Sequence, residues 1–233
     1  MSFLDHLEEL RRALLTSLAV VLVLASAAWF VSGPALELLI RTAGVGELVF
    51  LSPTEAFLTR IKVAFVLGLL AALPVILWRL WRFVLPALYA REARAIGFTV
   101  GLSTTLFLGG VAFAYLTVVP LAVKFLLGFG TPSLVPMISA GQYFGFVSKL
   151  CLGFGAMFQL PLVAMILGRI GLLTSKFLLD KWRHAIIVLA VVSALLTPPD
   201  LISQLLMLVP VLLLYGVSIL LVRRVEPARR ARG

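Results

Sequence analysis

Long apolar runs separated by short basic clusters are the feature that most constrains this chain. A helix that crosses about 30 Å of bilayer hydrocarbon needs about 20 mostly apolar residues. Six runs predict spanning helices: Ala13–Val31, Val63–Trp78, Ala95–Val119, Leu150–Gly168, Ala185–Leu196 and Leu205–Val222. With 62% hydrophobic residues, the chain has more apolar side chains than one water-soluble core of this size can bury. The sequence therefore predicts an all-α integral membrane protein, with residues 1–233 forming a single polytopic membrane domain.

The final two runs are expected to form a hairpin. They are separated by Thr197-Pro198-Pro199-Asp200, and two consecutive prolines cannot continue a helix. Ala185–Leu196 would give only about 18 Å of helix. Because this is shorter than the hydrocarbon core, we predict that the helix crosses only where the bilayer thins locally.

Two of the connections between runs are long and apolar. They lie around Ser32–Lys62 and Pro120–Lys149 and contain helix-like stretches such as Leu121–Leu127. Such amphipathic or apolar segments are expected to lie at the membrane interface or to cap the bundle.

The basic residues are distributed unevenly between the two sides of the predicted bundle. Of the 20 Lys and Arg residues, fifteen lie at the chain ends and in the connections after the second and fourth runs, and five lie in the other connections. Cytoplasmic segments carry the excess of Lys and Arg, so both ends of the chain are predicted to be cytoplasmic, with a basic tail from about Arg223. The formal charge of +10 is explained by this topology, and no nucleic-acid partner is predicted.

Residue types typical of catalytic or metal sites are scattered. Cys151 is the single cysteine, so no intrachain disulfide can form. His6 and His184 are far apart and lack ligand-type neighbours at metal spacing. The sequence contains no nucleophile–base or phosphate-binding motif. We therefore predict no enzymatic activity, no cofactor and no metal site.

Polar residues inside the predicted spans are few. Pro74, Pro161 and Pro210 are expected to interrupt three helices, either as packing kinks or as functional breaks. Gln159 lies deep in a span, where its amide can hydrogen-bond a neighbouring helix. No Asp, Glu, Lys or Arg lies near the centre of a predicted span. Carriers usually place ionisable groups at the midplane, so this distribution argues against a small-solute channel or carrier, the second hypothesis that six helices allow.

Carboxylates lie instead at the predicted cytoplasmic surface. Glu8 and Arg12 are four residues apart on a helical stripe and are expected to pair in part. Glu9 has no basic residue four positions later, and Glu92 lies just before the third span. Either acid can be a solvated charge at a helix end. Alternatively, two acids on an otherwise basic face are where a cationic partner would bind.

Several short motifs resemble those of one family in order and spacing, from Leu4 to about Val222. They are His6-Leu7-Glu8-Glu9-Leu10-Arg11, Ser52-Pro53-Thr54-Glu55-Ala56-Phe57, Pro74-Val75-Ile76-Leu77, Phe83-Val84-Leu85-Pro86-Ala87-Leu88-Tyr89 followed by Glu92, Ala112-Phe113-Ala114-Tyr115, and Leu196-Thr197-Pro198-Pro199-Asp200. Together these motifs are similar to the TatC family, the core signal-receptor subunit of the twin-arginine (Sec-independent) protein translocase.

The resemblance implies both a fold and a function. The fold would be a cupped-hand bundle of six transmembrane helices, of which the last two are short. The chain would be a receptor and assembly core that recognises, at the cytoplasmic face, folded proteins carrying a twin-arginine signal peptide. Export would be driven by the proton-motive force. The implied partners are the single-span proteins TatA and TatB, further copies of the chain and membrane lipids, in the cytoplasmic membrane of a prokaryote.

The resemblance also implies roles for individual residues. The signal-binding positions would be Glu9, Arg11, Phe83 and Glu92. Thr197 and Gln204 match polar positions that contribute to partner docking, and the alternative is that both only cap or solvate the hairpin tip. Gln159 is a further polar intramembrane position, where many relatives carry a glutamate. The structural positions would be Pro74, Pro198, Pro199 and Asp200.

Overall fold

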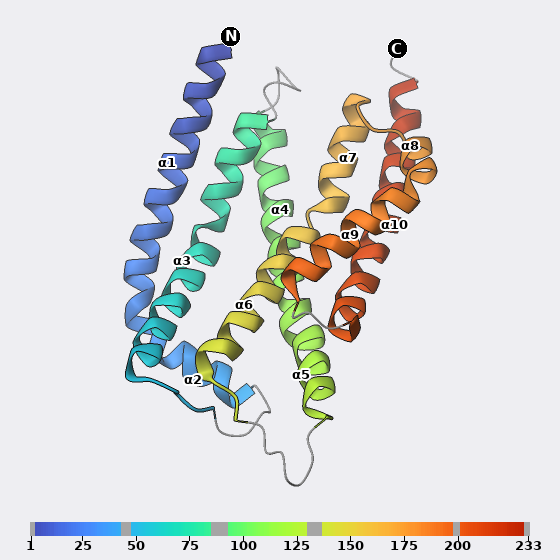
Figure 1. Cartoon of the computed structure of the whole chain (residues 1–233). Coiled ribbons are helices and arrows are strands. Elements are labelled where there is room, and N and C mark those ends of the chain that lie inside the picture. Colours follow the sequence, from blue (N-terminus) through green and yellow to red (C-terminus); the bar gives the residue numbers. More distant parts are fainter. Residues whose placement is uncertain (1–2, 43–47, 85–92, 130–136, 198–200, 231–233) are drawn as a thin grey trace. The chain divides into compact units, whose positions relative to one another are not determined.

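The computed structural model describes residues 3–42, 48–84, 93–129, 137–197 and 201–230, and these residues are almost entirely helical (Figure 1). The elements are α1 (Phe3–Ala28), the 3-10 turn η1 (Trp29–Val31), α2 (Ser32–Thr42), α3 (Pro53–Val84), α4 (Ala93–Phe113), the π-helical η2 (Ala114–Val118), α5 (Val119–Leu127), α6 (Ala140–Met157), α7 (Leu160–Ile170), α8 (Ser175–Asp180), α9 (Trp182–Leu196) and α10 (Leu201–Arg230). The all-α prediction is confirmed.

The helical stretches that can cross a membrane are longer than the apolar runs that predict them. Among the described residues, five helical stretches are long and apolar enough to span: Leu7–Arg41, Pro53–Phe83, Ile96–Leu127, Ala140–Ile170 and Leu201–Glu226. The apolar helix α9 has 15 residues and is short, as expected for the first helix of the hairpin. The expectation that the last helix is also short is wrong, because the apolar stretch of α10, Leu201–Glu226, has 26 residues. Each predicted run lies within or overlaps one of these helices, but the helices continue into the predicted connections, because a flank outside the hydrocarbon can stay helical when its ends are capped.

The contacts of the chain fall into two compact units. Unit 1 comprises Met1–Thr105 with Val135–Gly145, and unit 2 comprises Leu106–Leu134 with Phe146–Gly233. The interpretation of residues 1–233 as one membrane domain stays a prediction.

In unit 1, α1 packs along α3 (Figure 1). The two helices approach closely at Gly68, where a β-carbon would lie 2.4 Å from the backbone nitrogen of Ala25. Helix α2 then packs on the first turns of α3, where Leu36, Val63 and Phe144 form a buried cluster. Close packing of α1 on α3 brings the start of α1 to the end of α3, which positions the candidate site.

Two connections of unit 1 are joined at the opposite end of α3. Val49 and Ser139 form an isolated parallel β-bridge, in which the Val49 N–H donates to the Ile138 carbonyl and the Ala140 N–H donates to the Val49 carbonyl, both at 3.0 Å. The predicted long connection at residues 32–62 is thus mostly ordered as α2, this bridge and the first turns of α3.

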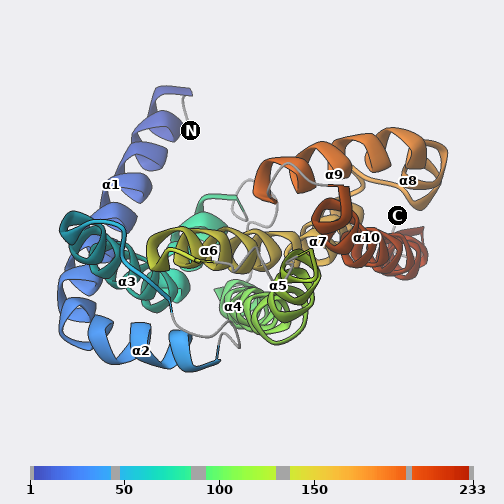
Figure 2. The same ribbon diagram turned by 60° about the horizontal axis from the view of Figure 1, so that its bottom comes forward.

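In unit 2, α10 packs against α7, α8 and α9, and Figure 2 shows α8, α9 and α10 together in a view turned from that of Figure 1. Glu226 near the end of α10 accepts hydrogen bonds from the backbone N–H and the hydroxyl of Ser175, both at 2.7 Å. The Tyr215 hydroxyl donates to the Leu178 carbonyl at 2.8 Å. These bonds attach the short helix α8 to α10.

The three predicted helix interruptions have different outcomes. Pro74 lies inside the continuous helix α3, and Pro210 lies inside α10. The α-helix is interrupted just before Pro161, since α6 ends at Met157 and α7 begins at Leu160, with Pro161 in its first turn. A proline in a spanning helix removes one backbone hydrogen bond, and neighbouring helices and local adjustment can preserve the helix around it.

Candidate functional site

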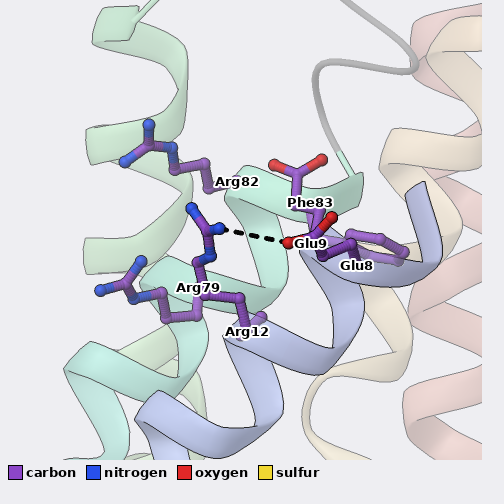
Figure 3. A pocket seen from close by; sticks show the side chains of 7 residues that line it. Glu8, Glu9, Arg12, Arg79, Arg82 and Phe83 are labelled. Carbon is purple, nitrogen blue, oxygen red and sulfur yellow. Dashed lines mark hydrogen bonds and ion pairs between the residues drawn. The ribbon is translucent and has the colours of Figure 1, made fainter. Parts of the chain in front are cut away.

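A pocket of about 360 Å³ lies in unit 1, where α1 begins and α3 ends (Figure 3). Most of its lining residues are charged. They are Glu8, Glu9, Arg12 and Ala13 from α1, and Arg79, Arg82 and Phe83 from α3.

Helical spacing explains why these side chains meet. Residues three or four apart lie on one side of a helix. Arg79, Arg82 and Phe83 therefore share one side of α3, near its C-terminal end. Helix α1 packs along α3, so the charged first turns of α1 face these residues and a pocket is left between them.

One pair of charges in the pocket is already matched. The Arg12 guanidinium lies 3.4 Å from the Glu8 carboxylate, as Figure 3 shows, which confirms the predicted i, i+4 pair. The two side chains are 75% and 71% exposed, so water screens the attraction and the pair contributes little to stability.

The structure brings two of the predicted signal-binding residues together. Glu9 and Phe83 both line the pocket, and both are half-buried. Arg11 is exposed on α1 and is not among the lining residues. Glu92 lies outside the described residues. The arrangement offers a partly shielded carboxylate beside an aromatic ring, which are the two groups that a guanidinium binds well.

Arg79 and Arg82 line the same pocket, although the sequence interpretation used them only to assign topology. A signal for them was present in the sequence. Their spacing from each other and from Phe83 places all three on one helix side, so any site built around Phe83 would include both arginines.

The predicted docking residues of the last hairpin hydrogen-bond within unit 2. The Thr197 hydroxyl donates to the Ser193 carbonyl at 2.9 Å, and Thr197 is only 8% exposed. The Gln204 amide donates to the Ala190 carbonyl of α9 at 3.1 Å and so ties α10 to α9. Pro198, Pro199 and Asp200 lie outside the described residues. The Thr197 bond lies at the C-cap of α9, and the Gln204 bond joins the two helices of the hairpin, while the docking and capping roles both stay predictions.

Gln159 lies in the break between α6 and α7. It occupies the N-cap position of α7, its backbone N–H donates to the Ala156 carbonyl at 3.1 Å, and its carbonyl accepts from Val163 at 2.9 Å. The position is therefore a local interruption within the fourth apolar stretch, Ala140–Ile170.

Comparison with known proteins gives consistent matches over nearly the whole chain. The model of the family described as Sec-independent protein translocase protein (TatC) matches residues 5–210. TatC of Carboxydothermus hydrogenoformans is 38% identical over 230 residues, which cover 97% of this chain and 95% of that protein. TatC of Aquifex aeolicus is 39% identical over 228 residues, which cover 95% of this chain and 94% of that protein.

Solved structures match as well. A crystal structure of the twin-arginine translocase receptor TatC aligns with a TM-score of 0.85 at 38% identity and covers 93% of this chain and 97% of its own. A second crystal structure of that receptor, in DDM, aligns with a TM-score of 0.86 and covers 94% and 99%.

The matches confirm the family that the motifs resemble, and with it the prediction that the protein is a transport component rather than an enzyme. The apolar helices agree with a multi-pass membrane protein. The chain therefore belongs to the TatC family and is a multi-pass membrane subunit of a bacterial twin-arginine translocase, which carries out Sec-independent protein translocation.

Proposed function

We propose that the pocket between α1 and α3 binds the twin-arginine signal peptides of folded proteins, and that the chain organises TatA- and TatB-type partners around the bound cargo. The proposal rests on one observation: Glu9 and Phe83, which are 74 positions apart in the sequence, line the same pocket. The packing of α1 on α3 brings these two distant residues together.

The chemistry of the pocket suits arginine. A guanidinium is planar and donates two parallel hydrogen bonds to one carboxylate, which an ammonium group cannot reproduce. Glu9 supplies one such carboxylate, and Glu92, in the connection after α3, is the proposed second. Phe83 offers an apolar edge or a ring face for a cation–π contact.

The proposed orientation puts this pocket in the cytoplasm, where cargo folds before export. Its support is the distribution of Lys and Arg, fifteen on the side of both chain ends and five on the other. In this orientation the protein lies in the cytoplasmic membrane with both termini inside.

Single-span partners and further copies of the chain are proposed to dock along the α9–α10 hairpin. Leu205, Val209 and Leu213 are spaced four residues apart on α10 and are 43%, 56% and 68% exposed. This apolar stripe fits a partner helix in lipid, beside Thr197 and Gln204 as polar contacts. The Thr197 hydroxyl and one N–H of the Gln204 amide donate within unit 2, so docking would engage the acceptor oxygens or the second N–H of Gln204, or exchange these bonds.

The experiment that tests the proposal is a comparison of two signal peptides. Purified full-length protein in detergent is titrated with a twin-arginine peptide and with the same peptide carrying paired lysines. Tighter binding of the arginine peptide, abolished by Glu9→Ala, is the expected result. Equal affinity for the two peptides would contradict the assignment.

A further inference from the structure

Among the described side chains that line the candidate signal pocket, arginines outnumber acids. They are three arginines and two glutamates. A twin-arginine peptide adds two guanidiniums, and like charges brought close together repel one another. A further anion beside the arginines would offset this repulsion when such a peptide is bound.

Arg79 and Arg82 are the groups available to hold that anion. Arg12 is engaged by Glu8 at 3.4 Å. Within the part of the chain that the structure describes, neither Arg79 nor Arg82 has a carboxylate at ion-pair distance. Arg82 is exposed and Arg79 is half-buried, and in Figure 3 both side chains extend to the same side, away from Glu8 and Glu9.

The location of the two arginines identifies the source of the anion as the membrane. They occupy the last turns of a spanning stretch, Pro53–Phe83. The neighbouring apolar residues Trp78 and Leu80 are 44% and 49% exposed. Exposed tryptophan is typical of the headgroup level of a bilayer, where lipid phosphates lie. Acidic lipids are abundant in the cytoplasmic leaflet and attract arginines near the surface.

We propose that Arg79 and Arg82 bind the phosphate of an anionic phospholipid, and that this lipid offsets the charge of the pocket so that a twin-arginine peptide can bind. Side chains three residues apart on a helix are neighbours, so two guanidinium forks can hold one phosphate from two sides. The lipid site stands on the geometry of α3, and only its effect on peptide binding rests on the proposed function.

The lipid site is tested first, without any peptide. Purified full-length protein is incubated with phosphatidylglycerol or phosphatidylcholine, and retained lipid is counted by native mass spectrometry. We expect selective retention of phosphatidylglycerol, reduced about tenfold in the double variant Arg79→Gln/Arg82→Gln. The matched control is Arg223→Gln/Arg224→Gln, an exposed arginine pair at the end of the spanning stretch of α10. Adjacent residues on a helix point in different directions and do not hold one phosphate together, so this variant should retain the lipid like the wild type.

Two results would overturn the lipid site. One is equal retention of phosphatidylglycerol by the wild type and by the Arg79/Arg82 variant. The other is displacement of the lipid by inorganic phosphate at matched concentration, which would make the site a general anion site and not a lipid site.

The second measurement is the affinity of a twin-arginine peptide for the protein in nanodiscs of phosphatidylcholine, with and without phosphatidylglycerol. We expect the acidic lipid to raise the affinity of the wild type about tenfold and to leave that of Arg79→Gln/Arg82→Gln unchanged. An equal response in both proteins would overturn the role of the lipid in peptide binding. If lipid binding depends on the arginines but no peptide binds in either membrane, the proposed function fails and the lipid site stands.

Discussion

The carboxylate of Glu55 accepts a hydrogen bond at 3.0 Å from the backbone N–H of Gly141, 86 residues further along the chain. It also accepts one from the Leu51 N–H at 2.8 Å and one from the hydroxyl of Ser139, while the Glu55 N–H donates to the Ser52 hydroxyl at 3.2 Å. Glu55 lies in the first turn of α3, and Gly141 lies in the first turn of α6. One carboxylate therefore caps the start of two helices, whose first N–H groups lack partners within the helix.

The first prediction concerns the space beside this cap. A β-carbon at position 141 would lie 2.8 Å from the Glu55 Oε1 atom and 2.9 Å from the Oγ1 atom of the buried Thr59. We expect Gly141→Ala to lower the free energy of unfolding by about 1–3 kcal/mol through overpacking. The cost of overpacking outweighs the gain of up to about 1 kcal/mol that alanine's higher helix propensity would give.

Gly145 is the matched control, one turn later in α6. A β-carbon there meets no atom within 4 Å. Gly145→Ala should therefore raise the free energy of unfolding by up to about 1 kcal/mol. Denaturant unfolding of both variants in the same detergent measures the difference, and effects of the same sign would contradict the geometry.

The second prediction tests the carboxylate itself. Removing it in Glu55→Ala leaves the N–H groups of Gly141 and Leu51 without an acceptor, so their hydrogen exchange should accelerate. Exchange at the N–H groups of Val49 and Ala140, which donate the hydrogen bonds of the adjacent β-bridge, should accelerate as well. The readout is residue-resolved hydrogen exchange in detergent micelles.

Glu37→Ala is the comparison variant for this experiment. Glu37 pairs with Arg41 within α2 at 2.6 Å, and both side chains are largely exposed. Removing such an exposed pair changes stability little. Acceleration at Gly141 in both variants would mean a general loosening of unit 1, and acceleration in neither would mean that the cap is not formed.

The third prediction is the orientation of the chain. Reporter fusions after Gly46 and Gly130 should report the outside, and a fusion after Gly233 should report the cytoplasm, because Lys and Arg concentrate on the side of both ends. An external signal from the fusion at Gly233 would disprove the proposed topology.

The number of apolar helices was predictable from the sequence, but their ends were not. An apolar run is required wherever a helix crosses lipid, so runs such as Val63–Trp78 mark the centres of spans. The ten residues from Pro53 to Lys62 extend that helix outside the run, because Ser52 and Glu55 cap its start. The motif Ser52–Phe57 was visible in the sequence. That its glutamate also caps α6 depends on a contact 86 residues away, which no local pattern contains.

The candidate site was also predictable only in part, because it depends on contacts between residues that are far apart in the sequence. Glu9 and Phe83 were identified through the family resemblance, and the structure places both in the pocket. The sequence explains Arg79 and Arg82 by the excess of Lys and Arg on the cytoplasmic side of a membrane protein. That explanation fits any arginine at the end of a spanning helix and does not indicate a binding role. Only the packing of α1 on α3 shows that these two arginines face the same pocket as the acids.

The fourth prediction concerns the short helix α9. Its 15 residues make about 22 Å of helix, less than the hydrocarbon thickness of about 30 Å. Inserting about six leucines after Val192 would remove this mismatch. We expect the variant to insert into the membrane but to export cargo poorly. Substituting leucine at Val191 and Val192 without lengthening is the control and should export normally. Unchanged export by the lengthened variant would exclude a role for mismatch.

The last prediction concerns the two acids proposed to bind the signal. A hydrogen bond between charged groups is worth about 1.5–3 kcal/mol, so Glu9→Ala and Glu92→Gln should each weaken binding of a twin-arginine peptide by about one to two orders of magnitude. If both carboxylates hold one rigid pair of arginines, losing either acid already frees the dipeptide in part. The double variant should then lose less than the sum of the two single effects.

The control for the two acids is Glu37→Gln. Glu37 is an exposed glutamate paired with Arg41, but it lies on α2 and does not line the pocket. Its removal should leave the peptide Kd unchanged, which separates a specific carboxylate from a general change in surface charge. The affinities are measured by titrating the purified wild type and each of the four variants with the arginine and lysine peptides. Wild-type binding by the Glu9/Glu92 double variant would disprove the assignment, because the arginines would then be held by groups other than these acids.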